Sequence, residues 1–393
     1  MEQKGVYKIN YISVNNIKSQ FCFSSNKGIK TFNTEDFSEQ HSIDELGNIS
    51  YCVLIRELNI VIFTGFEGNE LYTNKKIIVY DLNAKKELSS TSFLDEVKGL
   101  KIINKFLLVT IKSTIKIFSL ENFRNLQSVK DVVLPENEIY DVWESPQKED
   151  NLDMIFHIVY SFDKEISVNT FVGNDWKFEK KKDIKNKYGK IQGLFYIQKL
   201  DIVFAVDEKA KYIYGLDPNE GKEVMCVYRG SVPGEVTSMS LINQHYLLLN
   251  NINRTIYIIN LKPSGISLGG LIGKYGYGID SSIFLTIKYD EIMTKEDGTF
   301  FQKDFSQKGS ILWCNNEDNE FYLISYNGYA FRIKINFLKG KYNIASKKKF
   351  AEYKIMMENE EENVIQKSSK TFEFKSIFDK SEKKKNDDKF VNL

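Results

Sequence analysis

Hydrophobic runs alternate with polar clusters through about the first 340 residues of the chain. The runs are short and rich in β-branched and aromatic residues, and few show the i, i+3, i+4, i+7 spacing of an amphipathic helix. Examples are the segments 51–65, 75–82, 105–120, 154–162, 192–206, 245–261 and 320–335. The pattern predicts a chain built almost entirely of β-strands and turns.

A strand–turn–strand unit recurs among these runs. An apolar strand and a small polar turn precede a second strand that ends in a hydrophobic pair and then Asp or Asn, as in IVFAVDEKAKYIYGLDPNEGKEV. Such units are typical of propeller blades, and dividing about 340 residues by roughly 40–50 per blade gives seven. We therefore predict an all-β, WD40-like, seven-bladed β-propeller. The chain has no Trp-Asp dipeptide, and from the repeat alone a tandem of β-sandwiches remains the alternative.

The blade boundaries follow from the turn clusters. We place the blades at 5–45, 46–93, 94–129, 130–182, 187–230, 232–285 and 286–345, so that residues 1–346 form the propeller. Residues 347–393 are rich in charges of both signs and lack strand alternation, which predicts a mostly disordered C-terminal tail. The alternative is that KKFAEYKIM (348–356) supplies one strand that closes the ring.

Charge and cysteine content narrow the classes of partner. The chain has 54 Lys and Arg against 53 Asp and Glu, a net charge of +1, so any anion binding must come from a local group of residues. We expect no nucleic-acid partner. The four cysteines are scattered and form no CxxC pair, which predicts free thiols. The sequence has neither an apolar N-terminal run nor an apolar run of roughly 18 residues, so we expect a cytoplasmic protein.

Signals for catalysis are missing from the sequence. His41, His157 and His245 are isolated, with no nucleophile–base or metal-ligand spacing around them. The glycine-rich segment GGLIGKYGYG (269–278) lacks the Lys-Ser/Thr pair and the strand–helix context of a phosphate-binding loop. We expect no enzymatic activity, no metal and no cofactor.

One segment carries a family resemblance. CVYRGSVPGEVTSMSLINQHYLLLNNINRTIYIINL (226–261) resembles the phosphoinositide-binding PROPPIN propellers, and the likeness continues through 15–37, 61–102 and 319–335. In that family two consecutive arginines followed by glycine serve two headgroup pockets. Arginine suits this task because its planar fork satisfies two phosphate oxygens at once.

The resemblance implies one degraded pocket and one that is partly kept. Tyr228 stands in place of the first arginine, whereas Arg229 and Gly230 match the motif. In the first pocket Lys211 and Tyr214 replace a threonine and an arginine of the family.

In the second pocket Thr255 matches, Tyr257 replaces a histidine, and Arg254 replaces a glycine and is a candidate substitute cation. The alternative for Arg229 is an ion pair or solvated side chain, and for Thr255 a bond to its own backbone.

A membrane loop is the second implied feature. The family carries a loop between the third and fourth strands of blade six that dips into the bilayer, and the corresponding segment here is 262–281. Its apolar side chains would be favourable at the acyl–headgroup boundary, or would otherwise pack back onto the blade. These side chains are Ile266, Leu268, Leu271, Ile272 and Tyr275.

The resemblance thus implies a non-enzymatic scaffold. It would be recruited peripherally to autophagosomal, endosomal or vacuolar membranes that contain phosphatidylinositol 3-phosphate or 3,5-bisphosphate. Its other partners would be autophagy or trafficking proteins. The alternative is a WD-repeat scaffold that binds proteins and has little or no affinity for lipid.

Overall fold

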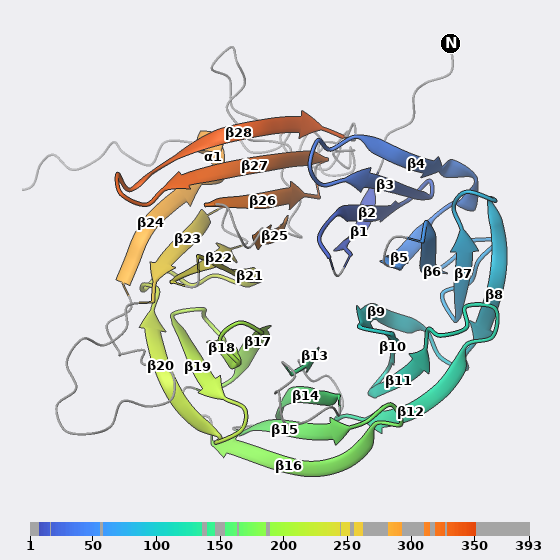
Figure 1. Cartoon of the computed structure of the whole chain (residues 1–393), viewed down its shortest axis with the longest axis horizontal. Coiled ribbons are helices and arrows are strands. Elements are labelled where there is room, and N and C mark those ends of the chain that lie inside the picture. Colours follow the sequence, from blue (N-terminus) through green and yellow to red (C-terminus); the bar gives the residue numbers. More distant parts are fainter. Residues whose placement is uncertain are drawn as a thin grey trace, which may run out of the picture. The chain divides into compact units, whose positions relative to one another are not determined.

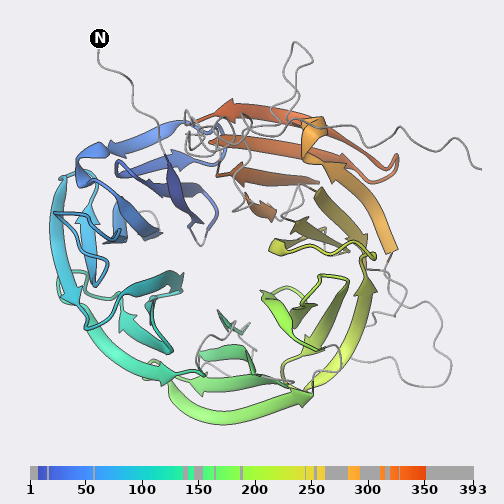
Figure 2. The same ribbon diagram turned by 180° about the vertical axis from the view of Figure 1, so that it is seen from behind.

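Seven four-stranded antiparallel sheets make up the part of the chain that the computed structural model describes, and they stand as blades around a ring (Figure 1). The described residues are 8–350 without 16, 56–57, 136–139, 146–153, 163–164, 186–188, 244, 252–254, 262–281, 293–309, 315–318 and 327. The predicted all-β, seven-bladed propeller is confirmed. Figure 2 shows the same ring from behind.

Each blade is made of four strands that are consecutive in sequence. Blades one and two contain β1 (Ile9–Val14), β2 (Gln20–Ser25), β3 (Ile29–Asn33), β4 (Glu39–Ile43), β5 (Ile49–Ile55), β6 (Ile60–Gly65), β7 (Lys76–Asp81) and β8 (Lys86–Ser92). Blades three and four contain β9 (Val97–Ile103), β10 (Phe106–Ile111), β11 (Thr114–Ser119), β12 (Gln127–Val133), β13 (Tyr140–Glu144), β14 (Ile155–Phe162), β15 (Glu165–Val172) and β16 (Lys177–Lys185).

The remaining blades follow the same order. Blades five and six contain β17 (Ile191–Ile197), β18 (Ile202–Asp207), β19 (Tyr212–Asp217), β20 (Lys222–Tyr228), β21 (Val236–Ile242), β22 (Tyr246–Asn251), β23 (Thr255–Asn260) and β24 (Ser282–Lys288). Blade seven contains β25 (Ser310–Cys314), β26 (Glu320–Ser325), β27 (Tyr329–Asn336) and β28 (Lys341–Lys349). Two short helices, η1 (Asp44–Leu46) and α1 (Tyr289–Ile292), lie in connections.

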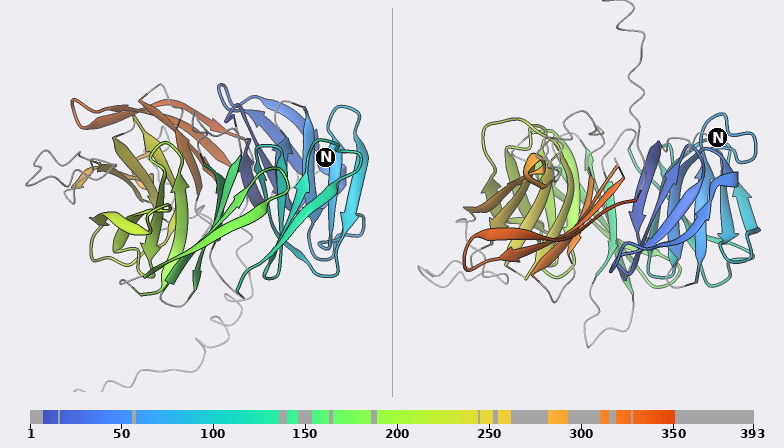
Figure 3. Two further views of the ribbon diagram at one scale, coloured as in Figure 1. Left: turned by 60° about the horizontal axis from the view of Figure 1, so that its bottom comes forward. Right: turned by 90° about the horizontal axis from the view of Figure 1, so that it is seen from above.

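Burial along each blade explains the sequence pattern. The first strands surround the centre of the ring, and the fourth strands, such as β16 and β28, wrap its rim (Figures 1 and 3). The second strands β6, β10 and β18 are buried along their whole length because neighbouring blades cover both faces. The predicted strand–turn–strand units are the second and third strands, and they read as near-continuous apolar runs for this reason.

Hydrophobic side chains form the main contact between neighbouring blades. One cluster of buried hydrophobic residues fills each boundary between blades. Main-chain hydrogen bonds add to this contact, as between the N–H of Val97 and the carbonyl of Asn74 at 2.8 Å. At the boundary of blades three and four the ring of Trp176 stacks on Phe156, with centroids 4.2 Å apart, and meets Phe106 edge-on at 5.7 Å. Trp176 is buried and is the largest side chain of that cluster.

The ring closes by the same kind of packing between blades seven and one. Phe350 directly follows β28, and its ring lies 5.4–5.6 Å from those of Phe21, Phe23 and Phe32 in blade one. The last strand therefore extends to Lys349, beyond the boundary expected after residue 346. The rest of the expected tail lies outside the described residues.

Candidate functional site at the boundary of blades five and six

Arg229 lies directly after β20, with its side chain turned into the boundary. It is only 4 % exposed. The guanidinium donates through Nε to the carbonyl of Ala210 and through Nη2 to the carbonyl of Val232. Three of the five guanidinium N–H groups are used once the bond to Tyr257 is included.

Tyr257 of blade six also contacts Arg229. Nη1 of Arg229 donates to Tyr257 Oη at 3.3 Å, and the guanidinium carbon lies 5.3 Å from the centre of the tyrosine ring. A cation over an aromatic face is attracted by the ring quadrupole, more strongly where water is excluded. Arg229 therefore joins blade five to β23 of blade six.

Thr255 lies on the same face of β23 as Tyr257. Residues two apart on a strand share a face, and Tyr257 packs against the cluster between blades five and six. Thr255 begins the strand, opposite Asn251 of β22 and Lys288 of β24. The structure thus brings Arg229 and Tyr257 into contact at this boundary, with Thr255 on the same strand face as Tyr257. That they bind a headgroup stays a prediction. Arg254 lies outside the described residues, and so does the loop with Ile266, Leu268, Leu271, Ile272 and Tyr275.

Tyr228 and Gly230 flank Arg229 in sequence and differ from it in environment. Tyr228 is 53 % exposed and pairs with Tyr212 across β19 and β20, with ring centroids 5.3 Å apart. Gly230 has φ +138°, a backbone conformation that favours glycine, and open space surrounds the position of a Cβ. Where the family has its first arginine, this chain exposes a pair of tyrosines.

The two other residues that the sequence assigned to the first pocket are separated by the fold. Tyr214 is buried in the cluster between blades four and five. Lys211 accepts the backbone N–H of Arg229 through its carbonyl at 2.8 Å. All residues of β19 after Tyr212 are buried, and alternation places Tyr214 on the face toward blade four, opposite to Ile213.

Gln192 holds the loop that follows Arg229. Its Nε2 donates to the carbonyl of Gly234 at 2.9 Å, and its Oε1 accepts the N–H of Val236 at 3.2 Å. Nε2 also donates to the carbonyl of Asp207 at 3.0 Å. The loop between β20 and β21 is therefore fixed at both ends, by Arg229 and by Gln192, while Ser231, Val232, Pro233 and Glu235 are exposed between or beside these contacts.

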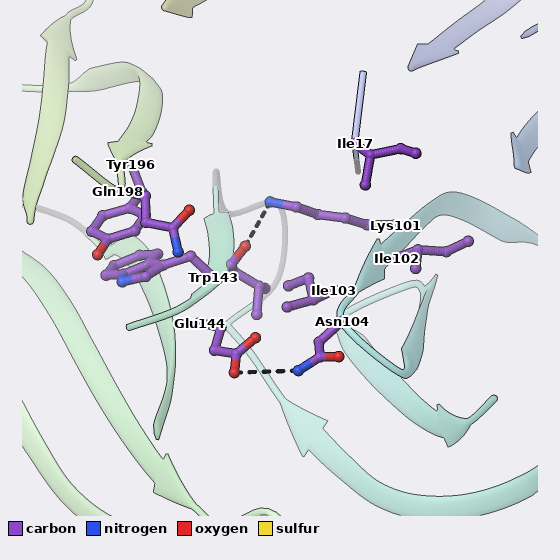
Figure 4. A pocket seen from close by; sticks show the side chains of 10 residues that line it. Ile17, Lys101, Ile102, Ile103, Asn104, Trp143, Glu144, Tyr196 and Gln198 are labelled. Carbon is purple, nitrogen blue, oxygen red and sulfur yellow. Dashed lines mark hydrogen bonds between the residues drawn. The ribbon is translucent and has the colours of Figure 1, made fainter. Parts of the chain in front are cut away.

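A cavity of about 580 Å³, away from Arg229, is lined by residues of blades three to five and by Ile17 of blade one (Figure 4). Its charged groups are paired: Lys101 Nζ binds Asp141 and donates to the carbonyl of Val142, and Asn104 donates to Glu144 at 3.3 Å. Burial raises the pKa of Glu144. No motif in the sequence indicates this cavity, and none of the site residues predicted from the sequence lines it.

His157 is a packed residue. Its Nε2 lies 2.7 Å from Ser145 Oγ and its Nδ1 3.1 Å from Thr170 Oγ1, while its ring stacks on Trp143. Burial lowers the pKa of His157 to about 4, and the charge of Lys180 adds to this effect. The imidazole is therefore neutral near pH 7 and serves the hydrogen-bond network of blade four.

The lowered pKa of His157 makes stability depend on pH. Between pH 6.5 and 4 the unfolded chain binds a proton that the native state does not, so the free energy of unfolding falls as the pH falls. We expect a loss of about 2 kcal/mol at pH 5 from this residue alone. Urea unfolding of wild type and His157→Gln at pH 7.5 and 5 measures it, because the difference at pH 7.5 reports packing only. Parallel pH profiles of the two proteins would contradict the assignment.

Neither a metal centre nor a membrane span is found among the described residues. They bring together no group of three or more His, Cys, Asp or Glu side chains able to hold a metal ion. They also contain no helix long and apolar enough to cross a membrane. Cys22 and Cys52 are buried free thiols at the boundary of blades one and two, with Sγ atoms 3.4 Å apart.

Solved propellers resemble this structure over most of its length. Hsv2 of Kluyveromyces lactis is 14 % identical with a TM-score of 0.65, and Hsv2 of Kluyveromyces marxianus is 14 % identical with a TM-score of 0.64. KlAtg21, solved in complex with the coiled coil of AgAtg16, is 13 % identical with a TM-score of 0.61. Each match covers 87 % of this chain and 99 % of the other.

No family model matches the sequence. Hsv2 and Atg21 are both PROPPIN proteins, so the resemblance predicted from 226–261 is confirmed in the three-dimensional fold. The chain has the fold of the PROPPIN propellers.

Proposed function

We propose that this chain is a divergent PROPPIN that is recruited to membranes containing phosphatidylinositol 3-phosphate or 3,5-bisphosphate. The observation that carries the proposal is the meeting of Arg229 and Tyr257 across blades five and six, with Thr255 on the same face of β23. These are the positions at which the sequence resemblance places the second headgroup pocket. A phosphate group needs such a local set of donors, because the net charge of the whole chain is only +1.

Headgroup binding requires one exchange at Arg229. A phosphate oxygen replaces the carbonyl of Val232 as the acceptor of Nη2, while the bond from Nε to Ala210 keeps the guanidinium in place. Val232 is 66 % exposed in the middle of its loop, so its displacement breaks little packing. The hydroxyl of Tyr257 accepts from Arg229 and can donate its own proton to the same phosphate.

The scaffold role concerns protein partners. KlAtg21, which shares the fold, was solved with the coiled coil of AgAtg16, and this supports autophagy proteins as partners of the present chain. We propose peripheral attachment to autophagosomal, endosomal or vacuolar membranes, with the segment 262–281 as a shallow second contact and no catalytic step. Weak headgroup and loop contacts on one surface add up to useful avidity.

Liposome flotation tests this function. We expect the chain to float with vesicles that contain phosphatidylinositol 3-phosphate and to float much less with vesicles in which phosphatidylserine supplies the same charge. The reason is that a tetrahedral phosphomonoester can accept from Arg229, Tyr257 and Thr255 together, whereas diffuse surface charge cannot. Equal flotation on both vesicles would contradict specific headgroup recognition.

The burial of Arg229 favours a second candidate function. Arg229 is only 4 % exposed, and three of its N–H groups are bonded inside the protein. These contacts can stabilise the boundary of blades five and six without any ligand. In that case the chain is a protein-binding scaffold with little affinity for lipid. The same flotation experiment separates the two, because this candidate predicts no flotation with either vesicle.

A further inference from the structure

The turn between β27 and β28 exposes an apolar side chain between two lysines. This blade-seven turn, residues 336–341, has the sequence Asn-Phe-Leu-Lys-Gly-Lys. Leu338 is fully exposed, and Lys339 and Lys341 are exposed beside it. A single exposed leucine is common on protein surfaces, so its neighbours and its support decide what it means.

The corresponding turns of blades one to five are built differently. Each of them contains at least one carboxylate when the strand ends are included, and several bury their apolar residue, as with Phe37, Leu82 and Trp176. The blade-seven turn contains no carboxylate and leaves its leucine in solvent. The carboxylates of the other turns are Glu35 and Asp36, Asp81, Glu121, Asp175, and Asp217 and Glu220.

Aromatic packing fixes the blade-seven turn on blade six. Phe337 stacks on Tyr246, with ring centroids 4.1 Å apart, and lies 5.8 Å from Phe284 of β24. Within the turn the N–H of Lys339 donates to Asn336 Oδ1 at 3.0 Å, and Gly340 takes φ +59°. Because Phe337 is held inside, Leu338 is held outside in a defined position.

The positive charge of the turn is not neutralised nearby. Lys339 and Lys341 form no ion pair in the part of the chain that the structure describes. The acidic groups around them have other partners: Glu320 lies 3.4 Å from Lys334 Nζ, and Glu291 accepts from Tyr342 Oη at 2.8 Å. An apolar tip between unpaired lysines is complementary to a surface with anionic groups above an apolar layer.

We propose that the blade-seven turn is a membrane contact, in which Leu338 enters the headgroup region of an anionic bilayer and Lys339 and Lys341 bind lipid phosphates. This inference rests on the proposed function. The segment 262–281, from which the sequence predicts another membrane contact, lies outside the described residues and is not needed for this inference.

Leu338→Asp tests the apolar part of the contact. We expect its affinity for phosphatidylcholine vesicles containing phosphatidylserine to fall about tenfold, because a leucine inserted in the headgroup region is replaced by a charge that lipid phosphates repel. The melting temperature should stay unchanged, since Leu338 is fully exposed. The matched control is Leu94→Asp, which changes an equally exposed leucine between β8 and β9, and which should bind as wild type does.

The lysines are tested by Lys339→Ala/Lys341→Ala. We expect about fivefold weaker binding per lysine at low ionic strength, and only on vesicles with phosphatidylserine. Equal binding of wild type, Leu338→Asp and Leu94→Asp overturns the turn contact. Equal weakening by Leu338→Asp and Leu94→Asp also overturns it, because the charge alone would then explain the loss.

Phosphatidylinositol 3-phosphate distinguishes this inference from the proposed function. Suppose that Leu338→Asp weakens binding to phosphatidylserine vesicles, but that adding phosphatidylinositol 3-phosphate does not strengthen the binding of the wild type. The turn contact then stands and headgroup recognition falls. Suppose instead that phosphatidylinositol 3-phosphate strengthens binding, and that Leu338→Asp binds every vesicle as well as the wild type does. The headgroup site then stands and the turn contact falls. A wild type that binds no vesicle overturns both.

Discussion

Arg229→Ala is expected to abolish measurable binding to phosphatidylinositol 3-phosphate vesicles and to lower the free energy of unfolding. A charge-assisted bond of this kind contributes about 1.5–3 kcal/mol, so its loss weakens binding roughly tenfold or more. Tyr228 already replaces the other arginine of the motif, so no second pocket compensates. For the same reason, headgroup titration of the wild type should give a stoichiometry of one.

The stability effect of Arg229→Ala has a separate cause. The carbonyl of Ala210 loses its donor inside the boundary of blades five and six, which costs about 1–3 kcal/mol. Thermal unfolding measures this loss, and binding is then compared at a temperature where the variant is fully folded.

Arg229→Lys keeps the charge but loses the planar guanidinium with its several donors, so we expect it to fold better than Arg229→Ala and still to bind vesicles weakly.

Tyr228→Arg should raise the avidity for vesicles only in part, because Lys211 and the buried Tyr214 do not rebuild the first pocket. Vesicle binding by Arg229→Ala at the wild-type level would refute the headgroup site and favour the protein scaffold.

Trp176→Ala should give a large loss of stability, about 3–5 kcal/mol. Trp176 is buried between blades three and four, stacked on Phe156 at 4.2 Å and packed edge-on against Phe106, so alanine leaves a cavity lined by aromatic rings. Urea unfolding at neutral pH gives the value. Vesicle binding per folded molecule should be unchanged, because this cluster is separate from the one at the boundary of blades five and six.

Trp176→Phe is the matched control for this prediction. It keeps an aromatic ring against Phe156, and the indole N–H has no hydrogen-bond partner among the described residues, so no hydrogen bond is lost. We expect it to cost less than half as much as Trp176→Ala. Equal stability of wild type and Trp176→Ala would show that the cluster does not hold blades three and four together.

The fold could be predicted because its strands have a regular physical signature. Neighbouring blades cover both faces of β6, β10 and β18, so these strands appear as unbroken apolar runs at a constant spacing. Phe350 had no such signature. It is a single aromatic residue after three lysines, and its partners Phe21 and Phe32 lie more than three hundred positions away.

The candidate site could be predicted only in part. Sequence likeness located Arg229, Thr255 and Tyr257, and strand alternation explains why the last two share a face. The burial of Arg229 depends on the carbonyl of Val232, which a loop brings back over the guanidinium. Motif spacing carries no information about such backbone acceptors, so the sequence could not show that headgroup binding requires an exchange of acceptors.

The use of four consecutive strands in every blade has a consequence for how the protein is made. As the chain leaves the ribosome, each sheet has all its strands before the next begins, so its hydrogen bonds form between segments that are close in sequence. Each new blade can then cover the apolar face of the one before it. Only the boundary between blades seven and one, where Tyr322, Ile324 and Phe350 pack against blade one, has to wait until blade seven has been made. Until then blade one keeps an uncovered apolar face, which is where a chaperone would bind the nascent chain.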